Sequence, residues 1–373
     1  MVSQCRICLA ELPEKADLLL QRQPPRAQRF STAPEQQDAI QRLDLKVKQC
    51  PACAVVQLDN EPVSYYREVI RAAGISPTMQ KFRQRQFANF RRKYQLEGKK
   101  LIEFGCGQGE YLQCWKSLQA VGMEFSAENC RLARSKGLQI IQGYIGETLP
   151  SDRPYQGFSM HSWLEHLPDI RQVLQNIRCC LDHDAVGLIE VPDFEMICRR
   201  NLVSEFIIDH LFYFTRQTLQ NTLASLGFEV LRIRNIWHDY IISAEVRMHR
   251  SFDASAFSQA QTRLLQQLDD FLEQQKIPIP IWGASHQALS LLAASRKKDK
   301  VACIIDAADF KQNRYSPGSN LPIVAPETLT KLMPDALLII AGSYNKEIIA
   351  SVRQKYGYAL RLACIEGNEL VQL

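Results

Sequence analysis

The stretch that decides the fold reads Lys99-Lys-Leu-Ile-Glu-Phe-Gly-Cys-Gly-Gln-Gly-Glu110. Its apolar part, Leu101 to Phe104, predicts a buried strand, and three glycines follow at alternate positions: Gly105, Gly107 and Gly109. Glycines at such a turn let the backbone bend sharply and approach a ligand closely. Apolar side chains then recur at the spacing of a helix, at Tyr111, Leu112, Trp115 and Leu118. A strand, a glycine turn and a helix in this order predict an open α/β sheet with a ligand at the turn.

Two acidic residues indicate which cofactor the turn would hold. Glu103 lies in the strand two residues before the first glycine, and Glu124 ends the next predicted strand, 122–126. A carboxylate at that strand end can accept hydrogen bonds from both ribose hydroxyls. The turn also lacks the sixth-position glycine of a dinucleotide fingerprint. The pattern therefore favours S-adenosylmethionine over NAD and is similar to that of the class I methyltransferases. We assign Cys106, inside the turn, and Trp163, at the end of a later strand, to the same site.

The following residues alternate between strand and helix patterns, as a doubly wound fold requires. We expect strands over 138–142, 157–163 and 186–191, a helix over 170–181, and a final antiparallel pair over 227–230 and 240–246. The strand over 157–163 opens into Leu164-Glu-His-Leu-Pro-Asp169. This loop would lie at the carboxyl end of its strand, where open α/β sheets bind their ligands. Class I methyltransferases that act on small molecules commonly have such a Leu-Glu-His-x-x-Asp loop.

Four of the twelve cysteines form two pairs, Cys5-Arg-Ile-Cys8 and Cys50-Pro-Ala-Cys53. Each pair presents two thiolates to one ion, and two pairs complete a closed tetrahedral site. We therefore predict a structural Zn²⁺ ion in an N-terminal module, followed by a short strand over 54–58. The 41 residues between the pairs must be partly ordered by other structure. We expect the other cysteines to be reduced, buried thiols: Cys106, Cys114, Cys130, Cys179, Cys180, Cys198, Cys303 and Cys364.

A largely helical connector over 62–95 follows the module. Phe82, Gln86 and Phe90 fall on one of its faces. Basic residues occupy the rest: Arg83, Arg85, Arg91, Arg92 and Lys93. We interpret them as a solvated basic face, with contact to an anionic ligand or a nucleic acid as the alternative.

A second α/β unit follows a linker helix over 258–275. Ile277-Pro-Ile-Pro-Ile-Trp-Gly-Ala-Ser-His286 predicts a strand that ends in a turn at Gly283. Strands over 300–306 and 335–341 continue a Rossmann-like pattern. We therefore predict an α/β protein with a Rossmann-like class I methyltransferase core, an N-terminal four-cysteine zinc module and a second, C-terminal Rossmann-like domain. The expected domains are the zinc module 1–60, a helical connector 61–98, the S-adenosylmethionine-binding domain 99–250, the linker helix 251–275 and the C-terminal domain 276–373.

Length and composition fit this division. A chain of 373 residues is too long for one ordinary core, and its 46% hydrophobic and 23% charged residues are typical of globular proteins. No apolar run approaches the roughly 20 residues of a membrane helix. The first 17 residues carry five charges, which argue against a secretory signal. We expect a cytoplasmic protein without membrane contact, and the net charge of +5 weakly favours anionic partners.

Together these features resemble the nucleotide-sugar C-methyltransferases, which methylate a carbon beside a ketone to make branched deoxysugars. The resemblance runs across the whole chain. It includes Pro24-Pro-Arg-Ala-Gln-Arg-Phe30 between the cysteine pairs and Leu164-Glu-His166 in the core. The C-terminal domain adds Asp306-Ala-Ala-Asp-Phe-Lys-Gln312, Pro317-Gly318, Leu321-Pro-Ile-Val324 and Pro326-Glu-Thr-Leu329 in the family's order. The resemblance implies that this domain is a wall of the nucleotide-sugar cleft. A domain that only packs is the alternative.

The resemblance also implies the catalytic residues. Carbon methylation needs a base that titrates near neutrality, which suits histidine. The family has its proposed base in a Tyr-x-Glu-His segment, which Ile207-Ile-Asp-His210 matches here. His210 then corresponds to the base and Asp209 to its acid, while Ile207 lacks the family's tyrosine hydroxyl. His166, in the Leu-Glu-His loop, would bind substrate or relay protons.

Further residues would face the substrate by the same resemblance. Either Tyr65 or Tyr66 corresponds to a family tyrosine after the zinc module, and Tyr213 begins a Tyr-Phe-Thr segment similar to the family's Tyr-Phe-Ser. His238 persists in Trp237-His-Asp-Tyr240, where the family has His-Gly-Gly-Ser. We assign these residues to substrate binding.

Three other functions stay open. A methyltransferase for another small-molecule acceptor, such as a sugar hydroxyl or amine of a polysaccharide pathway, is favoured by the replacement at Ile207. A nucleic-acid methyltransferase would use the zinc module and the basic helix, but the sequence has no aromatic RNA-binding signature. An intact glycine turn and Glu124 argue against a scaffold that only binds cofactor. We expect a small-molecule substrate, no nucleic-acid partner and a monomer.

Overall fold

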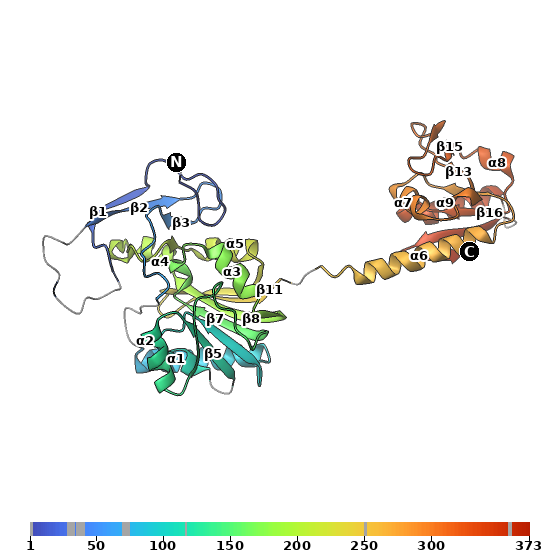
Figure 1. Cartoon of the computed structure of the whole chain (residues 1–373). Coiled ribbons are helices and arrows are strands. Elements are labelled where there is room, and N and C mark those ends of the chain that lie inside the picture. The colour runs from blue at the N-terminus through green and yellow to red at the C-terminus, as the bar shows by residue number, and fades with distance from the viewer. Residues whose placement is uncertain are drawn as a thin grey trace. The chain divides into compact units, whose positions relative to one another are not determined.

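The computed structural model describes residues 3–27, 34, 42–68, 75–115, 118–249, 252–356 and 360–373. The chain forms two compact units, Met1–Ser251 and Phe252–Leu373, each of which is described by itself (Figure 1). The domain boundary expected at residues 250 and 251 lies outside the described residues, as does the end of the 24–30 segment. Within the described ranges, no helix is long and apolar enough to cross a membrane.

The first unit contains a seven-stranded sheet in the order β10-β11-β8-β7-β4-β5-β6. The strands β4 to β8 run parallel, and β10 and β11 form the antiparallel pair that the sequence predicts. Because the strand order reverses between β4 and β7, the ligand crevice of such a sheet is expected there. The strands are β4 (Lys100–Phe104), β5 (Gln119–Glu124), β6 (Gln139–Gln142), β7 (Tyr155–His161), β8 (Leu181–Pro192), β10 (Phe228–Ile236) and β11 (Ile241–Met248).

The helices of this sheet domain begin at side-chain caps. The side-chain oxygens of Ser126, Asp169 and Thr215 accept hydrogen bonds from the first turns of α2, α3 and α5. Each cap satisfies a backbone N–H that has no partner within its helix. The α3 helix ends at Arg178 and does not reach Leu181 as predicted, because the long β8 strand already begins at Leu181. These helices are α2 (Ala127–Ser135), α3 (Ile170–Arg178), α4 (Phe194–Arg199) and α5 (Arg216–Ser225).

The helix predicted after the glycine turn is a single 3₁₀ turn, η2 (Leu112–Cys114). Residues 116 and 117, which that prediction included, lie outside the described residues. The indole of Trp115 stacks on the ring of Phe87 with a centroid distance of 3.9 Å. Phe87 lies far from Trp115 in the sequence. Because this stacking fixes the position of Trp115, we infer that tertiary packing overrides the helical pattern of residues 111–118.

The connector helix α1 spans Pro77–Lys93 and is shorter than predicted. Residues 62–68 form turns, and 69–74 lie outside the described residues. The prediction of a solvated basic face is wrong for Arg83, which is 1% exposed and faces the sheet together with Gln86 and Phe87. The interpretation fails because Arg83 pairs with the buried carboxylate of Glu190, which lies 107 residues away in the sequence.

The N-terminal residues form a four-stranded sheet in the order β1-β2-β3-β9. β1 (Leu18–Gln23) and β2 (Leu43–Gln49) pair within the interval between the cysteine pairs, which is therefore partly ordered as expected. β3 (Val56–Leu58) is the predicted short strand. The fourth strand, β9 (Phe212–Tyr213), comes from the methyltransferase segment and pairs with β3. The sheet of the cysteine module is thus completed by residues that directly follow His210.

The second unit is another open sheet, in the order β14-β15-β13-β12-β16-β17-β18. β15, β13, β12, β16 and β17 run parallel, while β14 and β18 are antiparallel edge strands. The expected linker helix is α6, whose Leu264, Leu268 and Leu272 belong to the core of this unit. The strands are β12 (Ile279–Trp282), β13 (Val301–Ile305), β14 (Arg314–Tyr315), β15 (Pro322–Val324), β16 (Ala336–Ile339), β17 (Arg361–Glu366) and β18 (Glu369–Gln372), and the helices are α6 (Ser255–Glu273), α7 (His286–Ala294), α8 (Thr328–Leu332) and α9 (Asn345–Tyr356).

Outside the four-cysteine group, most cysteines are buried as predicted. The prediction is wrong for Cys179 and Cys198, which are exposed. Both follow the last apolar positions of short helices, at the C-cap of α3 and near the end of α4, where the chain turns back to solvent.

Candidate active site

The glycine turn and Trp163 meet at the carboxyl ends of β4 and β7. Gly105 has a φ of 64°, and a Cβ atom there would lie 2.7 Å from Cγ of Trp163. Gly107 and Gly109 also have positive φ values, which strain residues with side chains. The indole therefore closes on the bare backbone of the turn, and a side chain at position 105 would displace it.

Glu124 ends β5, as the sequence predicts, and its carboxylate holds the glycine turn. The N–H groups of Gly107 and Ser126 each donate to one of its oxygens at 2.9 Å. The buried Cys106 is anchored by its own N–H, which donates to the carbonyl of Met123 at 3.2 Å. The structure thus brings the turn and the predicted ribose acid into direct contact.

Glu103 lies fully buried in the middle of the sheet. In the register of β4 it stands between Gly122 of β5 and Ser159 of β7. Glu103 is therefore an interior position of the strand that leads into the glycine turn.

A row of aromatic rings continues from Trp163 along the same edge of the sheet. The ring of Tyr144, which follows β6, lies 6.2 Å from that of Trp163 and 6.1 Å from that of Tyr66, in both cases edge to face. The guanidinium of Arg67 stands 5.1 Å above the Tyr144 ring. Of the two tyrosines that the sequence could not separate, Tyr66 thus lies on the cofactor side, whereas Tyr65 is buried.

One turn beyond Trp163, the 3₁₀ helix η3 (Leu164–His166) places His166 against His210. Their ring centroids are 4.7 Å apart. Nδ1 of His166 lies 2.8 Å from the backbone oxygen of Asp209 and carries the proton, because a carbonyl can only accept. Burial lowers the pKa of His166, and burial together with the neighbouring His166 lowers that of His210 well below its usual range. Both imidazoles are therefore neutral at neutral pH.

Glu165, which the sequence reasoning missed, belongs to the same cluster. A carboxylate oxygen of Glu165 and one ring nitrogen from each of His166 and His210 all lie within 4.8 Å of one another. Burial raises the pKa of Glu165 to about 8. The Leu-Glu-His motif contained the signal, but a motif does not say which of its side chains the fold turns inward.

The carboxylate of Asp209 and the ring of His238 do not belong to this cluster of acidic and histidine side chains. The carboxylate of Asp209 accepts a hydrogen bond from the N–H of Ala27 at 3.0 Å. His238 occupies an exposed turn with a φ of 60°, 5.2 Å from the ring of Trp237. These two side chains therefore lie outside the cluster, although the backbone oxygen of Asp209 contacts His166.

Tyr213 lies beside His210, with ring centroids 6.3 Å apart. Its hydroxyl accepts from the N–H of Ile207 at 3.1 Å and donates to the Ile207 carbonyl at 3.3 Å. Ile207, which stands where the family has a tyrosine, is thus held through its backbone by the hydroxyl of Tyr213.

The four paired cysteines converge at one point. Sγ of Cys5 lies 3.7 Å from that of Cys53, and Sγ of Cys8 lies 3.5 Å from that of Cys50. All four sulfurs lie within 4.8 Å of one another. Four Zn–S bonds of about 2.3 Å in a tetrahedron would set neighbouring sulfurs about 3.8 Å apart. The donor set and its spacing fit a tetrahedral thiolate site.

A buried ionic network, which no sequence pattern predicted, joins α1 to the sheet. The guanidinium of Arg83 contacts the carboxylate of Glu190, to which Gln86 also donates at 2.5 Å. Nδ1 of His161 lies 2.9 Å from the same carboxylate. Burial alone would raise the pKa of Glu190, but Arg83 and His161 hold it well below its usual range. Glu190 is therefore ionised at neutral pH.

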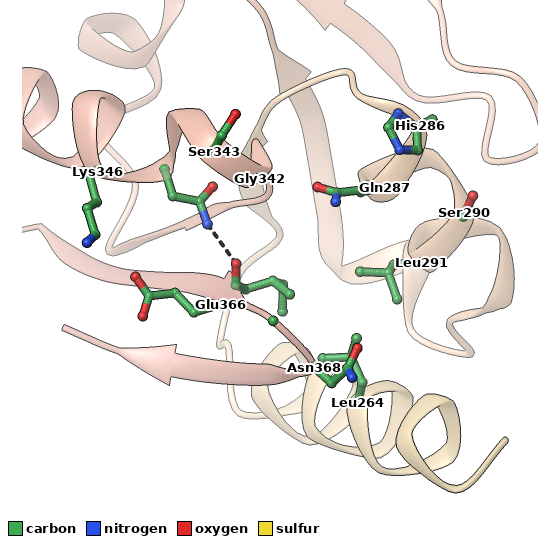
Figure 2. A pocket seen from close by; sticks show the side chains of 13 residues that line it. Leu264, His286, Gln287, Ser290, Leu291, Gly342, Ser343, Lys346, Glu366 and Asn368 are labelled. Atoms are coloured by element: carbon green, nitrogen blue, oxygen red, sulfur yellow. Dashed lines mark hydrogen bonds between the residues drawn. The ribbon is translucent and has the colours of Figure 1, made fainter. Parts of the chain in front are cut away.

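The second unit has a pocket of about 660 Å³ at the carboxyl ends of β12, β16 and β17. Strand order reverses between β12 and β16, which is where open α/β sheets bind ligands. Figure 2 shows the first turn of α7 facing the turn before α9 across this pocket, with an apolar wall from α6. Polar side chains line it: His286, Gln287, Ser290, Ser343, Asn345, Lys346, Glu366 and Asn368.

Asp306, which ends β13, does not line this pocket. Its carboxylate accepts from the N–H of Ala284 at 2.8 Å and from Nζ of Lys311 at 3.0 Å. The carboxylate of Asp306 is therefore hydrogen-bonded next to the Gly283 turn of the second unit.

The chain is similar to several known methyltransferases. A curated C-methyltransferase, NovU from Streptomyces niveus, is 22% identical over 295 residues, which are 69% of this chain and 70% of that protein. A solved methyltransferase from Aquifex aeolicus is 14% identical with a TM-score of 0.37, covering 47% of this chain and 94% of its own. Another, from Clostridium acetobutylicum, is 11% identical with a TM-score of 0.38, covering 45% and 92%.

Two family models match consecutive parts of the chain. Residues 77–233 match the methyltransferase domain, and residues 240–359 match the C-methyltransferase C-terminal domain. The first match contains the glycine turn, Trp163 and both clustered histidines. The chain therefore contains a methyltransferase domain, followed by a region that matches the C-methyltransferase C-terminal domain.

Proposed function

We propose that this methyltransferase methylates a carbon atom beside the ketone of a nucleotide-linked deoxysugar. The observation that carries the proposal is the single turn from Trp163 to His166. It joins the glycine turn, against which Trp163 packs, to a pair of neutral histidines, the half-buried His166 and the buried His210. A neutral imidazole next to a methyl donor is suited to removing a proton from carbon.

Each part of the site has a task in this reaction. S-adenosylmethionine supplies an electrophilic methyl group when it is bound. The residues that would hold it are Glu103, Gly105, Cys106, Gly107, Gly109, Glu124 and Trp163. His210 removes the proton that the ketone acidifies, and the electron pair left on the sugar takes up the methyl group. His166 orients His210 and the substrate, and Tyr66 and Tyr213 border the space beside them.

We propose that the four N-terminal cysteines hold Zn²⁺. All four tetrahedral positions are filled by protein sulfur, so the ion would have no open position for substrate. Its task would be structural, because it ties together the two turns that support β2 and β3.

We further propose that the pocket of the C-terminal unit, taken by itself, binds a ligand that carries a phosphate or a base. The supporting observation is the pocket at its switch point, where Lys346 and the hydroxyl and amide groups around it offer donors to phosphate or base.

A second candidate function is methylation of an oxygen or nitrogen on another small-molecule acceptor. The specific observation in its favour is Ile207, which offers no hydroxyl to a keto sugar. Tyr213 uses its hydroxyl on the Ile207 backbone instead. In this reaction His210 would remove a proton from oxygen or nitrogen.

The test is methyl transfer by the full-length protein to a panel of nucleoside-diphosphate 4-keto-6-deoxysugars. We expect a product heavier by one methylene unit, with the new methyl group on carbon by NMR. His210→Gln should lower turnover about 10²- to 10⁴-fold, the range of general-base catalysis. Its affinity for S-adenosylmethionine should stay within a few-fold, and the exposed His183→Gln serves as the control. A methyl group on oxygen or nitrogen would instead establish the second function.

A further inference from the structure

Glu165 lies at the centre of the proposed active site without a hydrogen-bonded partner. Its side chain is 1% exposed, and neither carboxylate oxygen has a hydrogen-bond partner among the described residues. Buried carboxylates are normally paired or hydrogen-bonded, since their isolated burial is costly. One of its oxygens lies within 4.8 Å of a ring nitrogen of His166 and of a ring nitrogen of His210.

The acid that the family resemblance would pair with His210 is occupied elsewhere. The carboxylate of Asp209 accepts the N–H of Ala27 at 3.0 Å, and its backbone oxygen faces Nδ1 of His166. His166 therefore presents only Nε2, an acceptor, to the rest of the cluster. Among the described acids, Glu165 alone joins the two histidines.

A base in this position needs a counter-ion. When His210 takes a proton from carbon it becomes a cation, next to a second imidazole and away from water. Burial penalises that cation, whereas a carboxylate within about 5 Å stabilises it. The reaction therefore gains from the negative charge that Glu165 provides once it is ionised.

We propose that Glu165 is the counter-ion of His210 and sets its basicity during proton abstraction. In this step the C–H bond beside the ketone breaks, and its proton binds the ring nitrogen of His210. The electron pair remains on the sugar as the enolate. The step runs in the form of the cluster that has lost its shared proton, so Glu165 is a carboxylate before and after it. Glu165 is thus a positioning residue that acts through His210, and the inference rests on the proposed function because it needs His210 as the base.

The charge state of the cluster follows from its surroundings. Glu165 has a raised pKa of about 8, so the cluster retains one shared proton at neutral pH and loses it as the pH rises. The other titratable groups around it are His166 on η3, Tyr213 on β9, Asp209 and the pair of Tyr240 and Glu205. The Tyr240 hydroxyl donates to Glu205 at 2.7 Å, so that carboxylate is already engaged.

The first test follows the imidazole itself and needs no substrate. Histidine ring signals of the full-length protein are titrated by NMR, with His210→Gln identifying the relevant signal among the seven histidines. We expect the ring signals of His210 to shift at about pH 8, where Glu165 ionises, and Glu165→Gln to abolish that shift. Glu165→Asp, which keeps the ionisable group, should restore part of the shift, and the exposed Glu97→Gln should change nothing. An unchanged His210 titration in a folded Glu165→Gln protein would overturn the inference.

The second test is the pH–rate profile of methyl transfer. In Glu165→Gln, kcat should fall 10- to 100-fold and the rising part of the profile should move to lower pH. Glu165→Asp should recover part of both, and the exposed Glu97→Gln should leave the position of the rising part unchanged. A purely structural role of Glu165 would lower the rate without moving the profile, and that result contradicts the inference.

The two failures can be told apart. If the unmodified protein methylates no keto sugar at carbon, the proposed function is wrong, while the NMR titration still decides whether Glu165 and His210 are coupled. If the unmodified protein is active and Glu165→Gln keeps both its rate and its profile, only the inference fails. Should Glu165→Gln not fold, as judged by circular dichroism, the same comparisons are made with Glu165→Asp, whose His210 pKa and profile must then differ from those of the unmodified protein.

Discussion

The guanidinium of Arg83 and the carboxylate of Glu190 form a pair whose side chains are 1% and 0% exposed. Gln86 and His161 complete the shell around Glu190. A buried pair of this kind contributes little compared with a well-packed apolar pair, but losing one partner leaves an uncompensated charge in the interior. The network therefore makes the position of α1 depend on both residues together.

We predict that Arg83→Met alone lowers the free energy of unfolding by about 3–5 kcal/mol. Glu190→Leu alone should have a similar effect, and the double variant should lose less than the sum of the two, as measured by urea denaturation. Glu97→Gln in the exposed pair with Arg91 should change stability by less than about 0.5 kcal/mol. Additive losses in the double variant would show that Arg83 and Glu190 are not coupled.

The same pair gives the protein a defined response to acid. The folded-state pKa of Glu190 lies below its ordinary value, so its stabilisation is complete above the unfolded pKa of about 4.3. It is lost as the pH falls toward the folded-state pKa. The stability difference between the protein and the double variant should therefore change only below about pH 4.3.

Sequence patterns predict a site residue when its position in the fold depends on the residues next to it in the chain. Gly105 and Glu124 were identifiable because a strand end and a glycine turn fix where their backbones lie. Glu165 and Arg83 were not, because their partners His210 and Glu190 lie 45 and 107 residues away in the sequence. A charge on a helix is usually solvated, and only the fold shows the exception.

The short strand β9 links the cysteine module to the proposed base. β9 pairs with β3, and the N–H of Leu58 donates to the carbonyl of Leu211 at 2.9 Å. Leu211 follows His210 directly, and the N–H of Ala27 binds the side chain of Asp209 just before it. The segment that contains His210 is thus held on both sides by the N-terminal module.

We predict that loss of zinc loosens this segment. Cys50→Ser should lower the zinc content measured by mass spectrometry and speed hydrogen exchange in β3 and in residues 211–213. Methyl transfer should fall with it, while affinity for S-adenosylmethionine stays within a few-fold, because β4 and β5 are not part of that sheet. The exposed Cys179→Ser should behave like the unmodified protein. Full zinc content in Cys50→Ser would refute the four-cysteine site, and unchanged exchange after zinc loss would refute the coupling.

The helices and strands differ in how well the sequence pattern predicts them. The parallel strands were predictable because their apolar runs end at glycines or acids, as at Phe104 and Ile305. The helix expected over 111–118 was not, since Trp115 packs on Phe87 and the chain follows that contact. β9 is two residues long, too short for any periodic pattern, and becomes a strand only through β3.

The two units of the molecule have separate hydrophobic cores. One core contains Phe104, Phe158 and Trp163, and the other contains Leu268, Ile281 and Leu338. The alternation of strands and helices in the sequence predicted both sheets, because each unit repeats the same strand–turn–helix pattern. Units with separate cores can unfold separately.

We predict two transitions in a calorimetric scan of the full-length protein. Saturating S-adenosylhomocysteine should raise only the transition of Met1–Ser251, by about 5–10 °C at 100 times its Kd. Cys50→Ser should lower that same transition, which identifies it. A single transition that shifts as a whole would show that the two units unfold as one.

The most direct test of the central claim, that His210 removes a proton from carbon for methyl transfer, is solvent-deuterium exchange. A nucleoside-diphosphate 4-keto-6-deoxysugar is incubated in D₂O with the full-length protein and S-adenosylhomocysteine, so that proton removal is not followed by methylation. We predict deuterium at the carbon beside the ketone with the unmodified protein and His183→Gln, and none above background with His210→Gln. Equal exchange with and without His210 would contradict the account.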